Sequence, residues 1–344
     1  MKIIRLLLFP LSLFYGTITA IRNFLFDINI LKSFEFNVPI IAVGNLSVGG
    51  TGKTPQVEYL IKLLADNYRL ATLSRGYKRK SKGFILADKN STAEILGDEP
   101  FQFYKKFSQI QVAVDANRKN GIENLLHLNN SPEIILLDDA FQHRKVKAGF
   151  YILLTTYDDL YCNDFMLPTG NLRENKTGAN RANLIIVTKC PKKISEATQI
   201  KIRKSLKIQK NQQVFFSFIA YDQKVYSDSS SLFISEIKNQ PKALIAGIAD
   251  PKPFFNYLKN DNDTILTFAD HHDFSAKDIE NCIKKAKNNR IITTEKDYVK
   301  LVGQFPKNQL YYLPIKSSFV SNKEAFDKII LNYVESSSRN SCLY

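Results

Sequence analysis

Short apolar runs alternate with amphipathic segments along most of the chain. The runs are continuous rather than alternating in hydrophobicity, which is typical of strands buried on both faces of a sheet. The segments between them place apolar residues three and four positions apart, as helices that cover a sheet do. We therefore predict an α/β fold with a mostly parallel sheet flanked by helices. The predicted strands of the first half are residues 38–43, 70–73, 110–114, 133–137, 151–154 and 184–188.

The second half repeats this pattern after a polar, lysine-rich stretch at residues 191–212. Predicted strands at 214–219, 243–248, 264–268, 290–294 and 310–314 alternate with predicted helices at 253–259, 276–287 and 323–334. We place the domain boundary at the end of the lysine-rich stretch. The prediction is a first domain at 29–210, a smaller α/β domain at 211–335 and a disordered tail at 336–344.

The first 28 residues form a separate amphipathic segment. Six apolar residues recur at helical spacing, while small or polar residues occupy the other side and basic residues flank the segment. The apolar positions are Leu7, Leu11, Phe14, Ile18, Ile21 and Leu25, and the other side carries Arg5, Ser12, Gly16, Thr19 and Asn23. The uncharged run is shorter than the ~20 residues that a bilayer span needs. We favour a helix lying in a membrane interface, with packing on the protein's own core as the alternative.

A glycine-rich turn at residues 44–54 lies between the first predicted strand and a predicted helix, which is the setting of a phosphate-binding loop. Its glycines let backbone N–H groups turn toward phosphate oxygens, and the helix N-terminus favours an anion. Lys53 supplies a positive charge and Thr54 a hydroxyl for Mg²⁺. A general phosphate loop has glycine where this chain has Ser47, and an ordinary glycine-rich loop is the alternative. The predicted nucleotide-binding residues are Ser47, Val48, Gly49, Gly50, Thr51, Gly52, Lys53 and Thr54.

Acidic residues follow the predicted strands downstream of this loop. Asp138 and Asp139 end the apolar run at 133–137, where a nucleotide enzyme holds magnesium directly or through water. Asp98 and Glu99 open a predicted helix, either as a helix cap with a first-turn acid or with one of them as a catalytic base. Arg75 follows the strand at 70–73, where ligands of open α/β sheets bind, although a solvated arginine fits equally well.

Composition limits the classes of protein that remain. The 344 residues include 48 Lys and Arg against 33 Asp and Glu, a net charge of +15 that suggests an anionic partner or only a solvated, lysine-rich surface. No nucleic-acid-binding motif is recognisable, so we expect no nucleic acid partner. The four cysteines are widely spaced, which argues against a zinc ribbon or a disulfide framework.

Seven motifs, taken in order, resemble the tetraacyldisaccharide 4'-kinases of lipid A biosynthesis. They are the loop at 43–55 with its serine, Ser74-Arg75-Gly76-Tyr77, Gly97-Asp98-Glu99-Pro100, residues 138–143, residues 170–174, Asp270-His271 and Thr294-Glu295-Lys296-Asp297. The resemblance runs from the N-terminal helix to about residue 300. It departs from the family pattern at Ala140, where the family often has glycine.

The resemblance implies a P-loop NTPase-like kinase with two α/β domains and the active site in the cleft between them. ATP with Mg²⁺ would phosphorylate the 4'-hydroxyl of a tetraacylated glucosamine disaccharide 1-phosphate. It also implies that Lys53 and the base Asp98 are catalytic, that His271 from the other domain partners Asp98, and that Thr54, Asp138 and Asp139 hold the metal. The candidate substrate-binding residues are Arg75, Glu99, Arg118, Arg173 and Glu174.

The resemblance further implies a peripheral enzyme on the cytoplasmic face of the bacterial inner membrane, with an acylated lipid substrate and no obligate protein partner. The alternative function is a membrane-associated regulatory P-loop ATPase. Such ATPases typically have lysine before the Gly-Gly of the loop, whereas this chain has Val48, and the difference favours the kinase.

Overall fold

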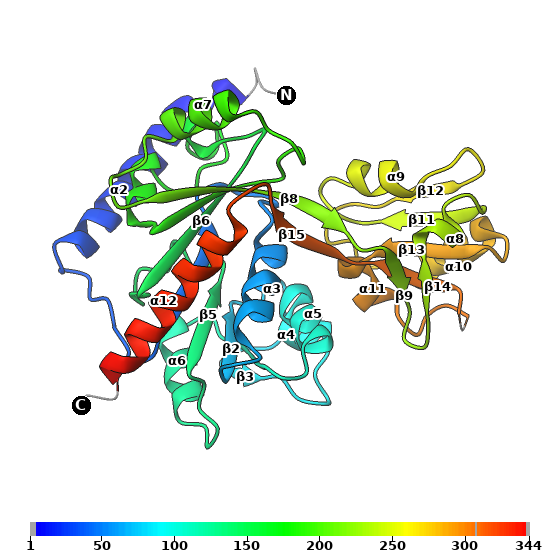
Figure 1. Ribbon diagram of the computed structural model, residues 1–344, viewed down its shortest axis with the longest axis horizontal. Helices are drawn as coiled ribbons and strands as arrows, with labels where there is room; N and C mark the ends of the chain where they lie inside the picture. The colour runs from blue at the N-terminus through cyan, green and yellow to red at the C-terminus, as the bar shows by residue number, and fades with distance from the viewer. Residues whose placement is uncertain (1–4, 307, 342–344) are drawn as a thin grey trace.

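The computed structural model describes residues 5–306 and 308–341, whose strands form two sheets in two lobes (Figure 1). We call residues 5–221 and 315–341 the large lobe and residues 222–314 the small lobe. The described strands of the large lobe form one sheet of nine, in the order β15-β8-β7-β6-β1-β5-β2-β4-β3. Those of the small lobe form a sheet of six, in the order β10-β9-β14-β13-β11-β12.

The bounds of the elements follow the chain. In the large lobe the strands are β1 (Ile40–Asn45), β2 (Leu70–Ser74), β3 (Ile85–Leu86), β4 (Gln111–Val114), β5 (Ile134–Asp138), β6 (Phe150–Thr156), β7 (Leu184–Thr188), β8 (Gln213–Tyr221) and β15 (Ile315–Phe319). Its helices are α2 (Phe9–Asp27), α3 (Lys53–Leu64), α4 (Ala93–Leu96), α5 (Asp98–Lys106), α6 (Arg118–Leu126), α7 (Glu196–Leu206) and α12 (Lys323–Ser341), with short 3₁₀ turns η1 (Tyr161–Asn163) and η2 (Lys176–Arg181).

The small lobe contains fewer and shorter elements. Its strands are β9 (Lys224–Tyr226), β10 (Ser231–Phe233), β11 (Lys242–Ala246), β12 (Thr264–Thr267), β13 (Arg290–Thr294) and β14 (Leu310–Leu313). Its helices are α8 (Ile234–Ile237), α9 (Lys252–Leu258), α10 (Ala276–Ala286) and α11 (Glu295–Leu301).

The predicted mostly parallel sheet is confirmed in the large lobe. Strand β1 pairs in parallel with β5 on one side and β6 on the other, and only the outermost strands β3 and β15 run antiparallel to their neighbours. Residues of β1, β2, β5 and β7 are buried throughout, which explains their continuous apolar runs. Because these strands are parallel, their carboxyl ends meet at one edge of the sheet, and the loops that follow them lie together there.

The predicted domain boundary at residue 210 differs from the structure. Strand β8 continues the large-lobe sheet beside β7, and the chain then returns through β15, which pairs antiparallel with β8 (Figure 1). Helix α12 also packs on the large lobe, with Phe326, Ile330 and Val334 fully buried in its core. Apolar periodicity predicts that an element is buried but does not specify its partner, so the two returning elements were assigned to the wrong lobe.

Two polar segments are helical. The lysine-rich stretch before the predicted domain boundary contains α7, whose Ile202 and Leu206 are buried on the large-lobe sheet. The predicted tail at 336–344 is helical through Ser341 as the end of α12, and residues 342–344 lie outside the described residues. A helix that is already anchored gains one hydrogen bond for each further residue that it orders, so it extends readily into a polar segment.

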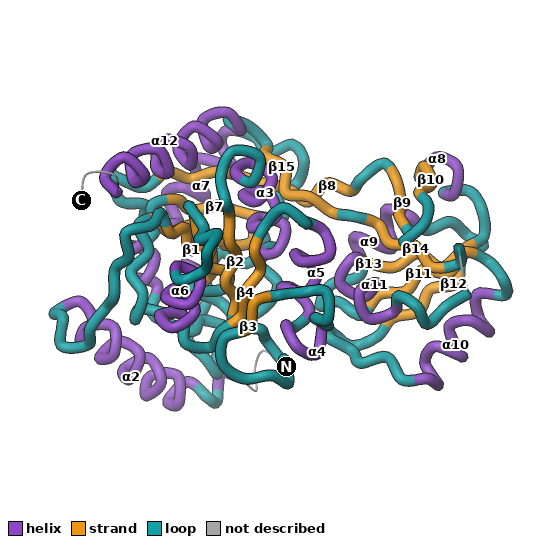
Figure 2. The backbone as a smooth tube through the Cα atoms, turned by 90° about the horizontal axis from the view of Figure 1, so that it is seen from below, coloured by secondary structure: helices purple, strands orange, loops and turns teal. Residues whose placement is uncertain are grey.

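Helix α2 lies along the outer edge of the large lobe (Figures 1 and 2). Its polar side faces the lobe. Ser12 is 4% exposed and its hydroxyl lies 2.7 Å from that of Thr169, while the Arg5 guanidinium donates to the carbonyl oxygen of Gly170 at 2.6 Å. Most of its apolar side chains face outward, with Phe14 69% and Phe24 58% exposed, whereas Phe26 is buried. This orientation rules out the alternative in which the apolar face packs on the protein's own core. No helix among the described residues combines the length and hydropathy of a membrane span.

Candidate functional site

The glycine-rich turn connects β1 to α3 as the sequence predicted. Gly49 has φ of 110° and Gly52, the N-cap of α3, has φ of 86°, values that side chains other than glycine rarely adopt. The loop is held from both ends: the Val48 N–H donates to the carbonyl of Asn171 at 2.8 Å, and the Thr188 hydroxyl donates to the carbonyl of Thr51 at 2.7 Å. The turn is therefore preorganised at the start of a helix, where an anion is favoured.

Lys53 and Asp139 meet beside this loop. The Lys53 ammonium lies 3.5 Å from Asp139 Oδ1 and 3.4 Å from Asn45 Oδ1. Arg173 lies 3.2 Å from both carboxylate oxygens of Asp139, so that acid is flanked by two cations. Burial raises the pKa of Asp139, but Lys53 and Arg173 outweigh burial and hold that pKa below its ordinary value.

Asp138, at the end of β5, is buried and has no hydrogen-bond partner on Oδ1 among the described residues. Burial, and then the neighbouring charge of Asp139, raise the pKa of Asp138 to about 7. A buried carboxylate oxygen without a partner beside a phosphate loop fits a Mg²⁺ site, because Mg²⁺ takes one or two protein oxygens and completes its shell with phosphate and water. No three His, Cys, Asp or Glu side chains cluster as an all-protein metal site in residues 5–306 and 308–341.

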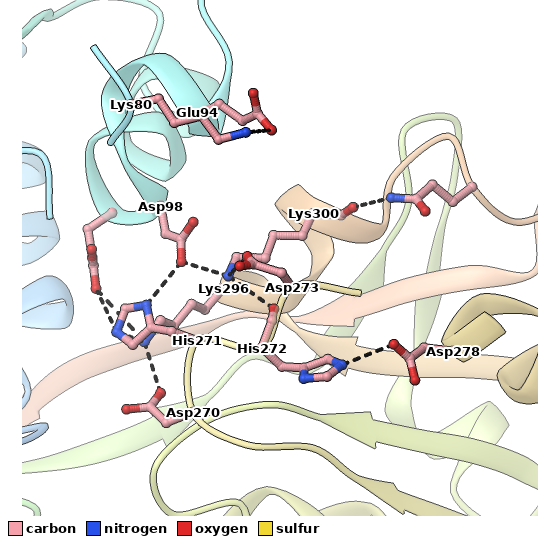
Figure 3. Close-up of polar contacts among 12 residues, drawn as sticks. Lys80, Glu94, Asp98, Asp270, His271, His272, Asp273, Asp278, Lys296 and Lys300 are labelled. Atoms are coloured by element: carbon pink, nitrogen blue, oxygen red, sulfur yellow. Dashed lines mark hydrogen bonds and ion pairs between the residues drawn. The ribbon is translucent and has the colours of Figure 1, made fainter. Parts of the chain in front are cut away.

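The two lobes meet at Asp98. Figure 3 shows this carboxylate, on α5 of the large lobe, facing a loop and a helix of the small lobe. Asp98 Oδ2 lies 3.1 Å from His271 Nδ1 and 2.9 Å from the Lys300 ammonium on α11. The expected hydrogen bond between Asp98 and His271 is thus present, although no role for the pair follows from the contact alone.

The sequence left open whether Asp98 caps the helix that it opens, and in the structure it does not. Gly97, with φ of 91°, is the N-cap of α5, and the side chain of Asp98 is committed to the small lobe. Burial raises the pKa of Asp98, but the hydrogen bonds from His271 and Lys300 outweigh burial and hold the pKa below its ordinary range. The carboxylate is therefore ionised at neutral pH and available as an acceptor.

His271 is held from several sides. It has φ of 56°, in the left-handed region, and its Nε2 lies 2.9 Å from the ammonium of Lys296 and 4.0 Å from Glu99 Oε1. The ring of Tyr77 approaches its ring edge-on with 5.5 Å between centroids. Lys296 also contacts Asp270 at 3.2 Å. Glu99, a predicted substrate contact, is therefore part of the same charged network.

The other candidate residues separate into two groups. Arg75 is exposed just beyond β2, and Arg173 lies at Asp139, so both remain candidates for contact with a ligand. Arg118 is 2% exposed and donates to the carbonyl oxygens of Asp115 at 2.6 Å and Asp138 at 3.3 Å. Its pKa falls to about 10 because of burial. Arg118 supports the end of β5 that carries Asp138, and its burial favours this structural role over contact with a substrate.

Glu174 also has a structural role. It is 3% exposed and its two oxygens accept from Arg181 at 2.8 and 2.9 Å, while Asn23 of α2 donates to Oε2 at 2.9 Å. These contacts engage both oxygens of the Glu174 carboxylate, which favours a structural role over the predicted contact with a substrate. The buried carboxylate ties the loop at 170–174 to the N-terminal helix.

The sequence motifs did not include Lys300 and did not separate the roles of residues 294–297. The Asp297 carboxylate accepts from the N–H of Gly247 at 2.9 Å, and Glu295 pairs with Lys106, so of the charged residues in that motif only Lys296 faces His271. Lys300 stands one helical turn after Lys296, on the same face of α11. The spacing of four residues between Lys296 and Lys300 was the feature of the sequence that could have identified Lys300.

The chain resembles known proteins along nearly all of its length. The family model for tetraacyldisaccharide-1-P 4'-kinase matches residues 4–335. A tetraacyldisaccharide 4'-kinase of Flavobacterium johnsoniae is 64% identical over 335 residues, covering 97% of this chain and 98% of the relative. Another, from Bacteroides thetaiotaomicron, is 46% identical over 358 residues, covering 97% and 94%.

A solved structure agrees with these matches. The crystal structure of LpxK from Aquifex aeolicus in complex with ATP superimposes with a TM-score of 0.77 at 31% identity, covering 96% of this chain and 99% of that one. The family match spans both lobes and every residue of the site described above, from the phosphate loop to Lys300. The chain belongs to the tetraacyldisaccharide-1-P 4'-kinase family.

Proposed function

We propose that this chain transfers the γ-phosphate of ATP to the 4'-hydroxyl of a tetraacylated glucosamine disaccharide 1-phosphate, a step of lipid A synthesis. Family membership and the names of the relatives support this activity. The observation that carries the proposal is the carboxylate of Asp98, held by His271 and Lys300 at the meeting of the two lobes. A regulatory ATPase has no need of such a carboxylate, so we do not favour that alternative.

Asp98 is proposed to receive the sugar hydroxyl. His271 and Lys300 both contact Oδ2, so the acceptor hydroxyl would bind at Oδ1. A depressed pKa makes Asp98 a weak base but a good hydrogen-bond acceptor. That is sufficient if phosphoryl transfer has a loose transition state, in which the nucleophile needs orientation more than early deprotonation.

The phosphate loop and its neighbours are proposed to bind ATP. The N–H groups of the loop and the Lys53 ammonium would contact the phosphate oxygens, and Thr54 and Asp138 would hold Mg²⁺. When bound, the ion would neutralise charge on the phosphate groups. Asp139 holds the Lys53 side chain beside the loop at 3.5 Å. Arg75 and Arg173 are candidates for the anionic groups of the sugar substrate.

Helix α2 is proposed to hold the enzyme on the cytoplasmic face of the inner membrane. Its outward apolar side chains would enter the interface, and its inward polar side chains fix it to the loop at 166–174. The neighbouring Arg173 contacts Asp139 at the phosphate loop. The membrane anchor and the proposed nucleotide site are therefore connected through one loop, which would keep the acyl chains in the bilayer while the sugar reaches the site.

A transfer assay tests the proposal. The purified chain is incubated with ATP labelled in the γ-phosphate and with the tetraacyl disaccharide 1-phosphate in mixed micelles. We expect label at the 4'-position of the distal sugar, and none with Lys53→Ala. Hydrolysis of ATP at the same rate with and without the lipid, and no labelled lipid, would instead support a regulatory ATPase.

A further inference from the structure

Lys189 lies at the phosphate loop although it is distant from it in sequence. It follows β7 directly, so its backbone is at the same sheet edge as the loop after β1. Its ammonium nitrogen is 4.0 Å from the position that a β-carbon on Gly50 would occupy, and no other described atom outside the adjoining residues comes within that distance. The space in front of Gly50 is therefore open except for this one cation.

The backbone at Lys189 is fixed in an uncommon conformation. Its φ of 55° lies in the left-handed region, which residues with a β-carbon rarely adopt. Of the other described lysines with positive φ, Lys207 and Lys287 are helix C-caps, where this conformation is ordinary, and Lys78 lies in a turn. Lys189 follows a strand, so helix capping does not explain its conformation, and such strain is concentrated at functional sites.

The preceding residue anchors this segment to the loop. The Thr188 hydroxyl donates to the carbonyl of Thr51 at 2.7 Å, and a β-carbon on Gly52 would lie 3.7 Å from the Thr188 β-carbon. Thr188 is 3% exposed, so this contact is protected from water. The position of Lys189 relative to the loop is thus set by a buried hydrogen bond rather than by a flexible surface contact.

The loop itself carries a single cation for a strongly anionic ligand. The Lys53 ammonium also pairs with Asp139, which lies on the β5 side of β1. The residue before the two glycines of the loop is the apolar Val48. Strand β7 lies on the other side of β1, beyond β6, so Lys189 approaches from the side opposite to Asp139. The two lysines flank the loop from both directions.

We propose that Lys189 is a second phosphate-contacting cation, which binds the phosphate groups of the nucleoside triphosphate together with Lys53. This assignment depends on the proposed function only in taking the ligand to be a nucleoside triphosphate. It assigns a binding role to the segment after β7, which lies outside the motifs that identified the site. Deleting the charge weakens the binding of ligands that carry phosphates and leaves the binding of the nucleoside unchanged.

Calorimetric titration of the full chain with ATP and with adenosine, without lipid, tests this assignment. Lys189→Asn removes the charge and suits the backbone, because asparagine tolerates positive φ. Lys189→Arg keeps the charge. Lys192→Asn is the matched control, since Lys192 is an exposed lysine of the same segment.

We expect Lys189→Asn to weaken ATP binding by roughly tenfold, as for the loss of one charge-assisted hydrogen bond, and to reduce the salt dependence of ATP affinity. Adenosine affinity and thermal stability should not fall. Lys189→Arg should retain most of the ATP affinity, and Lys192→Asn should match the wild type in every measurement.

ATP affinity within twofold of the wild type for Lys189→Asn overturns the assignment. An equal loss for adenosine and ATP also overturns it, because that result points to a structural or base-side role. In either case, ATP binding by the wild-type chain leaves the kinase proposal intact. A wild-type chain that binds no ATP overturns both.

Discussion

The outward apolar face of α2 gives a measurable prediction about membrane binding. Phe14 is 69% and Ile21 55% exposed, and neither side chain contributes to the core of the large lobe. The double variant Phe14→Ser/Ile21→Ser removes two of the exposed apolar side chains while the inward contacts of Ser12 and Asn23 remain. The fold should therefore be retained while membrane affinity falls.

The magnitude follows from the exposed fractions. Full burial of a phenylalanine or isoleucine side chain is worth about 2 kcal/mol, so the exposed fractions of the two side chains together contribute roughly 2.5 kcal/mol in the bilayer. Each 1.4 kcal/mol is tenfold in an equilibrium constant, which gives a loss of roughly 60-fold in the partition coefficient. The change from two apolar to two polar side chains makes this a lower bound.

Sedimentation with vesicles of bacterial phospholipids measures the partition coefficient. The matched control is Phe233→Ser, because Phe233 is 45% exposed but lies in the small lobe, away from α2. The reasoning is refuted if the double variant binds vesicles within threefold of the wild type, or if Phe233→Ser loses as much. Kinase activity toward a short-chain, water-soluble acceptor should be nearly unchanged, since the nucleotide site is intact.

Three further predictions concern the site and the core. Asp98→Asn and His271→Gln should each lower kcat at least tenfold, and the double variant should lose less than the product of the two effects; a strictly multiplicative loss would show that they act independently. Burial and the charge of Glu295 raise the pKa of Glu58 to about 7. Protonated Glu58 therefore stabilises the folded state fully at pH values below the ordinary pKa of a glutamate, and this stabilisation is lost as the pH rises through about 7. The Tm of the Glu58→Gln variant minus the Tm of the wild type should increase as the pH is raised from 5 to 8. If the two Tm values change with pH in parallel, the raised pKa of Glu58 is contradicted. Phe326→Ala should lower the free energy of unfolding by about 3–5 kcal/mol, because this fully buried ring packs on three other rings, and a loss below 1 kcal/mol by chemical denaturation would contradict the packing of α12 on the large lobe.

The central strands of both sheets were predictable because burial on two faces imposes continuous apolar runs. The edges were not. Strand β15, whose sequence Ile-Lys-Ser-Ser-Phe has polar residues at its centre, pairs with β8 nearly a hundred residues earlier, and nothing local to it identifies that partner. Helix α12 likewise shows an apolar stripe without indicating which lobe it covers. Long-range pairing of this kind is decided by the whole fold.

The site was predictable where chemistry demands particular residues in a fixed local order, as at Lys53 and the Asp138-Asp139 pair. The sequence could not show where burial commits a polar side chain to structural contacts. Arg118 and Glu174 are as polar as Arg75, but buried hydrogen bonds hold them in the framework. Lys300 and Lys189 were missed for the opposite reason, since an isolated lysine in sequence reveals nothing about the carboxylate or loop that it faces.

The packing of α12 has a consequence for folding of the chain during its synthesis on the ribosome. The hydroxyl of Tyr333 accepts from the N–H of Ile40 at 3.2 Å and donates to the Ile40 carbonyl at 3.1 Å, at the first residue of the strand that leads to the phosphate loop. The large-lobe sheet is also incomplete until β15 has been made. On the ribosome, therefore, the small lobe can fold while the nucleotide lobe still lacks its last strand and covering helix. Chains that terminate early would hold an unfinished nucleotide site, and ATP binding would begin only after the C-terminal helix has emerged.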